Sequence, residues 1–249
     1  TGKLTVEKDI ILGSGTPCKN CGKDYESDDP AFIKWSDNDR INNSGTLNVT
    51  NIDFEKKVDT GTDADTLINS GDLTADGDIS FGRDGDRLDN TGSLTVTGSI
   101  DFGDGNDTFK TGYDLDVAGV IDGGSGDNDI EFGENLPHYF DGSENTDYGE
   151  VHAKNFKNWS VGYQKGGNWD YDGNFSDDDS GNPRLVTFVL EKGTFRARDN
   201  NPPKFNIFEM DGGYIDFVKT QSEKPALLVK ESFEYKRGSL YIDARAIGS

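Results

Sequence analysis

Short runs in which apolar and polar residues alternate recur along the first half of the chain. In one set of runs, a leucine is followed two residues later by a valine or an alanine, with one polar residue between them. Alternation with a period of two is typical of a β-strand that has one buried and one exposed face. We therefore expect a series of short strands. The leucines of this set are Leu47, Leu73, Leu94 and Leu115.

Each of these runs belongs to a longer repeat with two more apolar positions. One apolar residue lies six residues before the leucine, and an isoleucine lies five or six residues after it. An aspartate opens each repeat, so the repeats begin at Asp39, Asp65, Asp86 and Asp107, with a degraded fifth start at Asp129. The intervals between these starts are 26, 21, 21 and 22 residues.

Three short strands in about 21 residues predict one coil of a parallel β-helix, an all-β solenoid with protruding loops. Coils stack about 4.8 Å apart, which places equivalent residues of successive repeats above one another. Asn43, Asn69 and Asn90 are expected to form an amide ladder that is interrupted at Thr111. An antiparallel β-sandwich of repeated hairpins is the alternative fold, but it gives no reason for the matching columns.

The column of aspartates raises the question of cation binding. Carboxylates at Asp65, Asp86 and Asp107 would lie one coil apart and repel one another, so they either reach solvent or share a cation. Solvated turn residues are the default expectation.

The phrases "GDGND" (103–107) and "GGSGDND" (123–129) resemble the calcium-binding nonapeptide repeat of secreted RTX proteins, although here they recur once per coil and not in tandem. This resemblance makes Ca²⁺ a candidate ligand, and no other cofactor is expected. The candidate metal ligands are Asp104, Asp107, Asp127 and Asp129.

Composition restricts the classes of partner. The chain has 249 residues and a formal net charge of −22, so its electrostatic field repels nucleic acids and anionic membrane surfaces. No apolar run approaches the roughly 18 residues of a membrane-spanning helix, and no direct membrane insertion is expected. Only 32% of the residues are hydrophobic, a share that alone would allow disorder, but 15 Phe, 9 Tyr and 3 Trp indicate a narrow packed core.

The two cysteines, Cys18 and Cys21, form the short motif "CKNC". A thioredoxin-type site would need a βαβ context, which the surrounding sequence lacks. A zinc site would need two more ligands, and the two histidines, His138 and His152, lie far away in the sequence. We therefore expect Cys18 and Cys21 to close a small disulfide loop in an exported protein.

Longer phrases resemble the passenger domains of bacterial autotransporters. They are "DTLINSGDL" (65–73), "DRLDNTGSLTVTGSIDFG" (86–103) and, more weakly, "FKNWSVGYQKGGNWDYDG" (156–173). The resemblance covers about residues 39–133. It implies a right-handed β-helix on the bacterial cell surface, exported and attached to the outer membrane through a β-barrel that this chain lacks.

Most passengers of this family are adhesins, so the resemblance implies a non-enzymatic adhesin or a rigid stalk that presents binding loops. Its partner would be a host-cell or bacterial surface receptor, either a protein or a glycan, and chains of this kind can also associate with one another. The alternatives are a β-helical polysaccharide-active enzyme and a calcium-dependent RTX-like rod.

Signals of catalysis in the sequence are weak, and no enzyme activity is expected. The phrase around Ser180, Asp-Ser-Gly, resembles the nucleophile segment of chymotrypsin-like proteases, which some autotransporters carry. However, Asp178 stands where that pattern has glycine, and His138 lies only 42 residues before Ser180. A solvated acidic turn is the favoured interpretation. The two histidines are expected to be isolated surface or turn residues.

The chain divides into an end-cap segment (1–38) with the disulfide, regular coils (39–149) and less regular coils (150–249). Binding residues are expected in the large loops, because loops carry most recognition residues. These loops are 14–37, 55–64, 170–184 and 198–205, and Pro202-Pro203 should make the last one project from the sheet. Trp35 and Tyr25 are candidate aromatic anchors for a ligand, although both could instead cover the open end of the coil stack.

Overall fold

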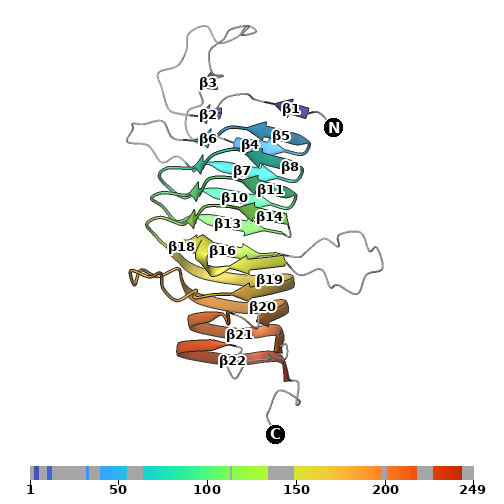
Figure 1. Ribbon diagram of the computed structural model, residues 1–249, viewed down its shortest axis with the longest axis vertical. Helices are drawn as coiled ribbons and strands as arrows, with labels where there is room; N and C mark the ends of the chain where they lie inside the picture. Colours follow the sequence, from blue (N-terminus) through green and yellow to red (C-terminus); the bar gives the residue numbers. More distant parts are fainter. Residues whose placement is uncertain are drawn as a thin grey trace, which may run out of the picture.

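The chain winds into a parallel β-solenoid of about seven turns, with roughly 24 residues per turn. The computed structural model describes residues 3–5, 10–12, 32–33, 40–54, 64–112, 114–133, 149–197, 201–217 and 227–242. Within these ranges every strand pair is parallel, and the only helical residues form the single 3₁₀ turn η1 (Ala153–Asn155). The coils follow one another in chain order along the long axis of the molecule (Figure 1). The predicted all-β solenoid is therefore confirmed.

Three sheets form the sides of the solenoid in the described residues. The five-stranded sheet contains β1 (Lys3–Thr5), β5 (Thr46–Val49), β8 (Asp72–Ala75), β11 (Ser93–Val96) and β14 (Asp114–Val117). The seven-stranded sheet contains β3 (Phe32–Ile33), β2 (Ile10–Leu12), β6 (Ile52–Asp53), β9 (Ile79–Ser80), β12 (Ile100–Asp101), β15 (Ile121–Asp122) and β18 (Phe156–Lys157). The ten-stranded sheet begins with β4 (Arg40–Asn43), β7 (Thr66–Asn69), β10 (Arg87–Asn90), β13 (Thr108–Thr111) and β16 (Asp129–Phe132). It continues with β19 (Trp159–Asp172), β20 (Leu185–Ala197), β21 (Lys204–Phe217) and β22 (Leu228–Ile242), and β17 (Gly149–His152) pairs with β19 beside this path.

The register of the strands confirms the predicted columns. Leu47, Leu73, Leu94 and Leu115 lie directly opposite one another in the five-stranded sheet. The repeat is 21 residues through β7, β10, β13 and β16. For this reason the predicted fifth start was wrong by one residue: Asp129 pairs with Thr108, and Asn128 takes the place that follows Asp107 in the column.

The amide ladder is also confirmed. The side chain of Asn43 donates to Asn69 Oδ1 at 2.8 Å, and Asn69 donates to Asn90 Oδ1 at the same distance. All three side chains are buried. The ladder ends at Thr111, whose hydroxyl donates instead to the carbonyl of Gly112 at 3.0 Å.

Aromatic rings fill the core along the axis. Phe54, Phe81 and Phe102 stack with ring centroids 4.9 and 4.8 Å apart and planes 7° apart. Trp159 meets the Phe102 ring edge-on at 5.4 Å, and its indole N–H donates to the carbonyl of Ile121. The ring spacing matches the distance between hydrogen-bonded strands, so one aromatic ring per coil builds a continuous core.

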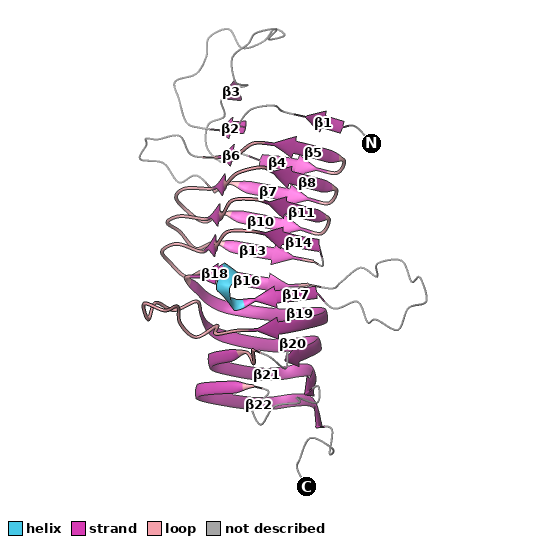
Figure 2. Ribbon diagram, in the orientation of Figure 1, coloured by secondary structure: helices cyan, strands magenta, loops and turns pink. Residues whose placement is uncertain are grey.

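The coils change in character at β19. Earlier coils turn between two four-residue strands, whereas β19 to β22 are continuous strands of 13 to 15 residues that bend around the same corner (Figure 2). Gly167, Gly193 and Gly213 lie in these bends with φ of 67°, 85° and 67°, a region that favours glycine. These glycines therefore lie inside long strands and not between short ones.

The longer strands also correct two predicted loops. β19 runs to Asp172, so the first loop spans only 173–184, and β21 already begins at Lys204. Pro203 does not project: it is buried, and its carbonyl accepts a hydrogen bond from the Leu228 N–H at 3.0 Å. The segment 14–37, apart from β3, and the segment 55–63 lie outside the described residues.

Candidate functional site

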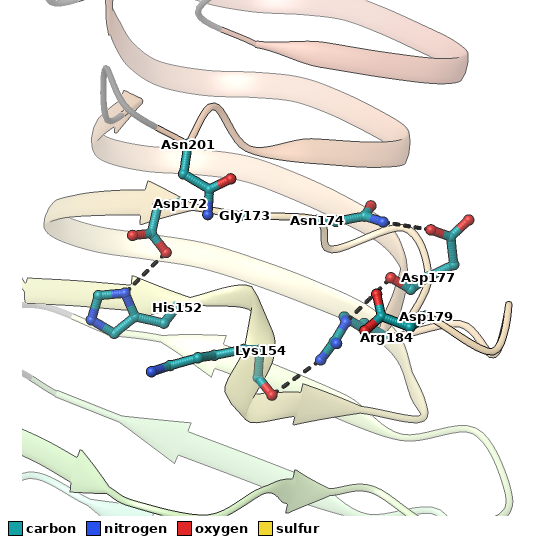
Figure 3. Close-up of a pocket in the computed structure, with 9 residues that line it drawn as sticks. All are labelled: His152, Lys154, Asp172, Gly173, Asn174, Asp177, Asp179, Arg184 and Asn201. Carbon is teal, nitrogen blue, oxygen red and sulfur yellow. Dashed lines mark hydrogen bonds and ion pairs between the residues drawn. The ribbon is translucent and has the colours of Figure 1, made fainter.

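A polar hollow of the described surface opens where η1, the end of β19 and the 173–184 loop meet. It has a volume of about 320 Å³. Figure 3 shows side chains from three successive coils around it. The residues that line this groove are His152, Lys154, Asp172, Gly173, Asn174, Asp177, Asp179, Arg184 and Asn201.

Arg184 holds the loop against η1. One nitrogen of its guanidinium, Nη1, donates to the carbonyls of Ala153, Lys154 and Phe156 at 3.0, 3.1 and 3.2 Å. The Nε–H donates to the carbonyl of Asp177 at 3.2 Å. Arg184 thus joins the loop to η1 and the start of β18, and it brings its positive charge to the groove.

His152 forms the opposite wall of the groove. It lies directly across from Asp172 in the β17–β19 pair, and its Nδ1 is 2.9 Å from Asp172 Oδ1. Its Nε2 is 3.5 Å from Glu150 Oε2. The two carboxylates hold the half-buried imidazole in place on this wall of the groove. The sequence interpretation of His152 as an isolated residue was wrong.

The 173–184 loop is ordered by its own side chains. Asn174 donates to Asp177 Oδ1 at 2.5 Å, and Asp178 accepts hydrogen bonds from the main-chain N–H groups of Ser180 and Asn182 at 2.8 and 2.9 Å. A hydrogen bond from Lys230 is the main cause that lowers the pKa of Asp177 to about 2. The hydrogen bonds from Asn182 likewise lower the pKa of Asp178. Both carboxyls therefore remain ionised over the physiological range.

The chemistry of the lining defines what the groove can hold. Among the described residues, its lining contains a lysine, an arginine and a histidine, three carboxylates and two amides, and no Phe, Tyr, Trp or aliphatic side chain. Ligand pockets for apolar molecules are mostly hydrophobic. An even mixture of charged and amide groups instead suits a hydroxyl-rich ligand, whose groups both donate and accept hydrogen bonds.

The predicted metal ligands do not form one site in the structure. Asp107 is 1% exposed, whereas Asp104 and Asp127 are exposed on the turns, and Asp104 accepts a hydrogen bond from the Ser125 hydroxyl at 2.7 Å. Asp129 lies on the outer face of β16. Among the residues that the structure describes, no three His, Cys, Asp or Glu side chains are grouped so as to hold a metal ion. Calcium binding stays a prediction.

The expectation that the aspartate column is solvated was wrong. Asp65, Asp86 and Asp107 are each only 1% exposed, because the column lies on the inner side of the turn that leads into the ten-stranded sheet. The carboxylates of Asp86 and Asp107 accept hydrogen bonds from the main-chain N–H groups of Asp65 and Asp86 in the coil before, which a periodicity argument alone does not reveal.

Ser180 lies exposed in the loop, as expected for an acidic turn, and its N–H is bound to Asp178. The candidate anchors Trp35 and Tyr25, the cysteines Cys18 and Cys21, and His138 all lie outside the described residues. The sequence pointed to the 170–184 segment but missed the contribution of His152. Its 20-residue separation from Asp172, close to one coil, is the signal that could have identified the pair.

No protein-family model matches the chain, and neither a curated protein nor a solved structure matches it. Among the described residues, no helix has the length and apolarity needed to cross a membrane.

Proposed function

We propose that this chain is a rigid, non-enzymatic rod of an exported surface protein that presents a polar groove and loops to a surface receptor. The observation that carries the proposal is the parallel ladder of the ten-stranded sheet, which continues from β4 to β22, with β19 and β20 still paired on either side of the 173–184 loop. Each coil of a solenoid is held by its two neighbours. Such a stack is therefore stiff and holds its loops in fixed positions.

An adhesin or stalk role on the bacterial cell surface, as an autotransporter passenger, agrees with this architecture. The support consists of the solenoid, the strongly acidic composition and the sequence resemblance of residues 39–133. The lining of the groove favours a glycan over an apolar ligand, since its amides and carboxylates offer hydrogen bonds to hydroxyl groups.

The test is binding of the purified chain to a glycan array and to whole cells, compared with a variant of the groove. Lys154 and Asp179 are exposed groove residues whose side chains form no hydrogen bond or ion pair within the described part of the chain. The double variant Lys154→Ala/Asp179→Asn should therefore keep its melting temperature and lose about tenfold or more in affinity. The matched control is Lys192→Ala/Asp116→Asn, which alters one cation and one carboxylate elsewhere. Equal binding by the two double variants would contradict a role for the groove.

A polysaccharide-active enzyme is the second candidate, because Asp172, Asp177 and Asp179 share one groove with Arg184 and His152. Glycoside hydrolysis uses pairs of carboxylates, with one as the acid. In this case incubation with bound polysaccharide would release new chain ends, and Asp172→Asn would abolish the release while binding persisted. Binding without any release supports the rod.

A further inference from the structure

The charged side chains that line the groove differ in whether another side chain balances their charge. Asp172 has a partner in His152, whose Nδ1 is 2.9 Å from Asp172 Oδ1. Asp177 has a partner in Lys230, whose ammonium group donates a hydrogen bond to Asp177 Oδ2. These two carboxylates are therefore already engaged. The lining residues that form no ion pair within the described part of the chain are Lys154, Arg184 and Asp179.

Arg184 brings its positive charge to the groove without a carboxylate partner. Its Nε and Nη1 donate to four main-chain carbonyls, which are neutral acceptors. Hydrogen bonds from Asn182 are the largest cause that lowers the pKa of Asp178, and the charge of Arg184 adds a smaller effect. A guanidinium has five N–H groups, and the two on Nη2 donate to no described residue. Arg184 therefore keeps two charged donors for a ligand.

Lys154 and Asp179 provide the other two charges without a partner. Lys154 belongs to η1, Asp179 belongs to the 173–184 loop, and both side chains are exposed. Figure 3 shows Lys154 with His152 on one side of the groove, and Asp179 with Arg184 on the other side. Two positive charges and one negative charge leave an excess of one positive charge in the groove, although the whole chain has a formal net charge of −22.

This excess of positive charge determines which kind of glycan fits the groove best. A neutral glycan donates hydroxyl hydrogen bonds to Asp179, but it covers two cations without giving them an anion, and burying an unpaired charge costs free energy. A carboxylate on the glycan supplies that anion, and its hydrogen bonds to charged donors are stronger than neutral ones. A glycan with many negative charges is disfavoured, because the field of the whole chain repels it.

We propose that the groove selects a glycan that carries a single carboxylate. Lys154 and Arg184 attract the carboxylate, and Asp179 accepts hydrogen bonds from hydroxyl groups of the same glycan. This inference rests on the proposed function, in which the groove belongs to the receptor-binding surface, and it adds the chemical class of the glycan. Lys154 and Arg184 are thus the residues that determine specificity, whereas Asp179 contributes to the binding of neutral and acidic glycans alike.

The test is binding of the full chain to matched pairs of oligosaccharides. The two members of a pair differ only in one sugar, which is a uronic acid in one member and the parent hexose in the other. An array identifies the bound pairs, and calorimetry measures their affinities. The acidic member should bind roughly tenfold more tightly or better, because hydrogen bonds between charged groups are about twice as strong as neutral ones. Oligosaccharides with several carboxylates should bind more weakly than those with one.

A variant of one lysine tests where the preference comes from. Lys154→Gln removes one of the two cations, so the preference for the acidic member should fall to about threefold or less. The affinity for the neutral member should change less than about threefold, and the melting temperature should stay the same, because the exposed Lys154 side chain has no partner. Lys192→Gln is the matched control. It removes an exposed lysine of β20 that does not line the groove, and it should keep the full preference.

The outcomes separate this inference from the proposed function. Equal affinity for the two members of every bound pair would overturn the inference and leave glycan binding intact. The inference is also overturned if Lys154→Gln keeps the full preference, or if oligosaccharides with several carboxylates bind most tightly. Binding of neither member contradicts the role of the groove in the proposed function, and the inference fails with it.

Discussion

Single side chains in this solenoid connect neighbouring coils by hydrogen bonds. Two columns do so with different residue types, one with asparagine and one with aspartate. Asn69 donates both to Asn90 Oδ1 and to the carbonyl of Ser93, at 2.8 and 2.7 Å, while its own oxygen accepts from Asn43. An amide offers donors and an acceptor at every pH. A carboxylate in the same kind of position offers acceptors only, as Asp86 and Asp107 do to the main-chain N–H groups of the coil before.

Replacing Asn69 by alanine should lower the free energy of unfolding by about 2–3 kcal/mol. The change removes the partner of Asn43 Nδ2 and leaves the carbonyl of Ser93 without its side-chain donor, and a buried group that loses its partner costs about 1–3 kcal/mol. Urea unfolding followed by circular dichroism measures the loss. Asn48→Ala, on the outer face of β5, is the control and should change stability by about 0.5 kcal/mol or less. Similar losses in both variants would show that the ladder contributes no more to the free energy of unfolding than an exposed asparagine does.

At the scale of elements, the regular coils were readable from the sequence because stacking forces each column to keep one residue type. The columns of Leu73 and Asn69 are examples, and both were predicted correctly. The coils after Trp159 were not readable in the same way. There a bend at a glycine such as Gly193 replaces the polar turn, and one long bent strand has the sequence pattern of two short strands separated by a glycine.

The candidate groove was only half visible in the sequence, for a physical reason. Gly173, Gly181 and the run of aspartates predict the loop, because glycine and aspartate are typical turn residues. The other wall of the groove contains His152 and Lys154, which come from the coil before. Their distance from the loop in space depends on the register in which β17 pairs with β19. A pairing register of this kind is a property of the folded stack.

Arg184 is the residue that joins this loop to the rod, and its loss should act locally. Arg184→Gln removes the hydrogen bonds to the carbonyls of Ala153, Lys154, Phe156 and Asp177. Limited proteolysis should then cleave the 173–184 loop several times faster, whereas global stability should fall by only about 1–3 kcal/mol. Arg83→Gln, an exposed arginine in an earlier coil, is the matched control. Unchanged cleavage in Arg184→Gln would show that the loop is held by its own turn bonds.

At the scale of the whole molecule, charge is unevenly balanced. The chain has 47 acidic and 25 basic residues. Some of the basic residues form ion pairs, such as Lys157 with Asp122. Exposed pairs contribute only about 0–1 kcal/mol each, so they do not offset the mutual repulsion of an excess of 22 negative charges along a rod. The repulsion acts against folding and against close approach of two rods.

Salt should therefore stabilise this protein, although it weakens the individual ion pairs. Raising NaCl from about 0.01 to 0.1 M shortens the screening length from roughly 30 to 10 Å, which suppresses repulsion between coils more than attraction within a pair. The melting temperature should rise by several degrees, and a fall would show that the ion pairs dominate.

A comparison of CaCl₂ with MgCl₂ at equal ionic strength separates screening from binding of a specific cation. Equal melting temperatures in the two salts indicate screening alone, whereas an extra rise with Ca²⁺ that EDTA reverses requires a bound ion, because only a ligand of the folded state adds stability beyond screening.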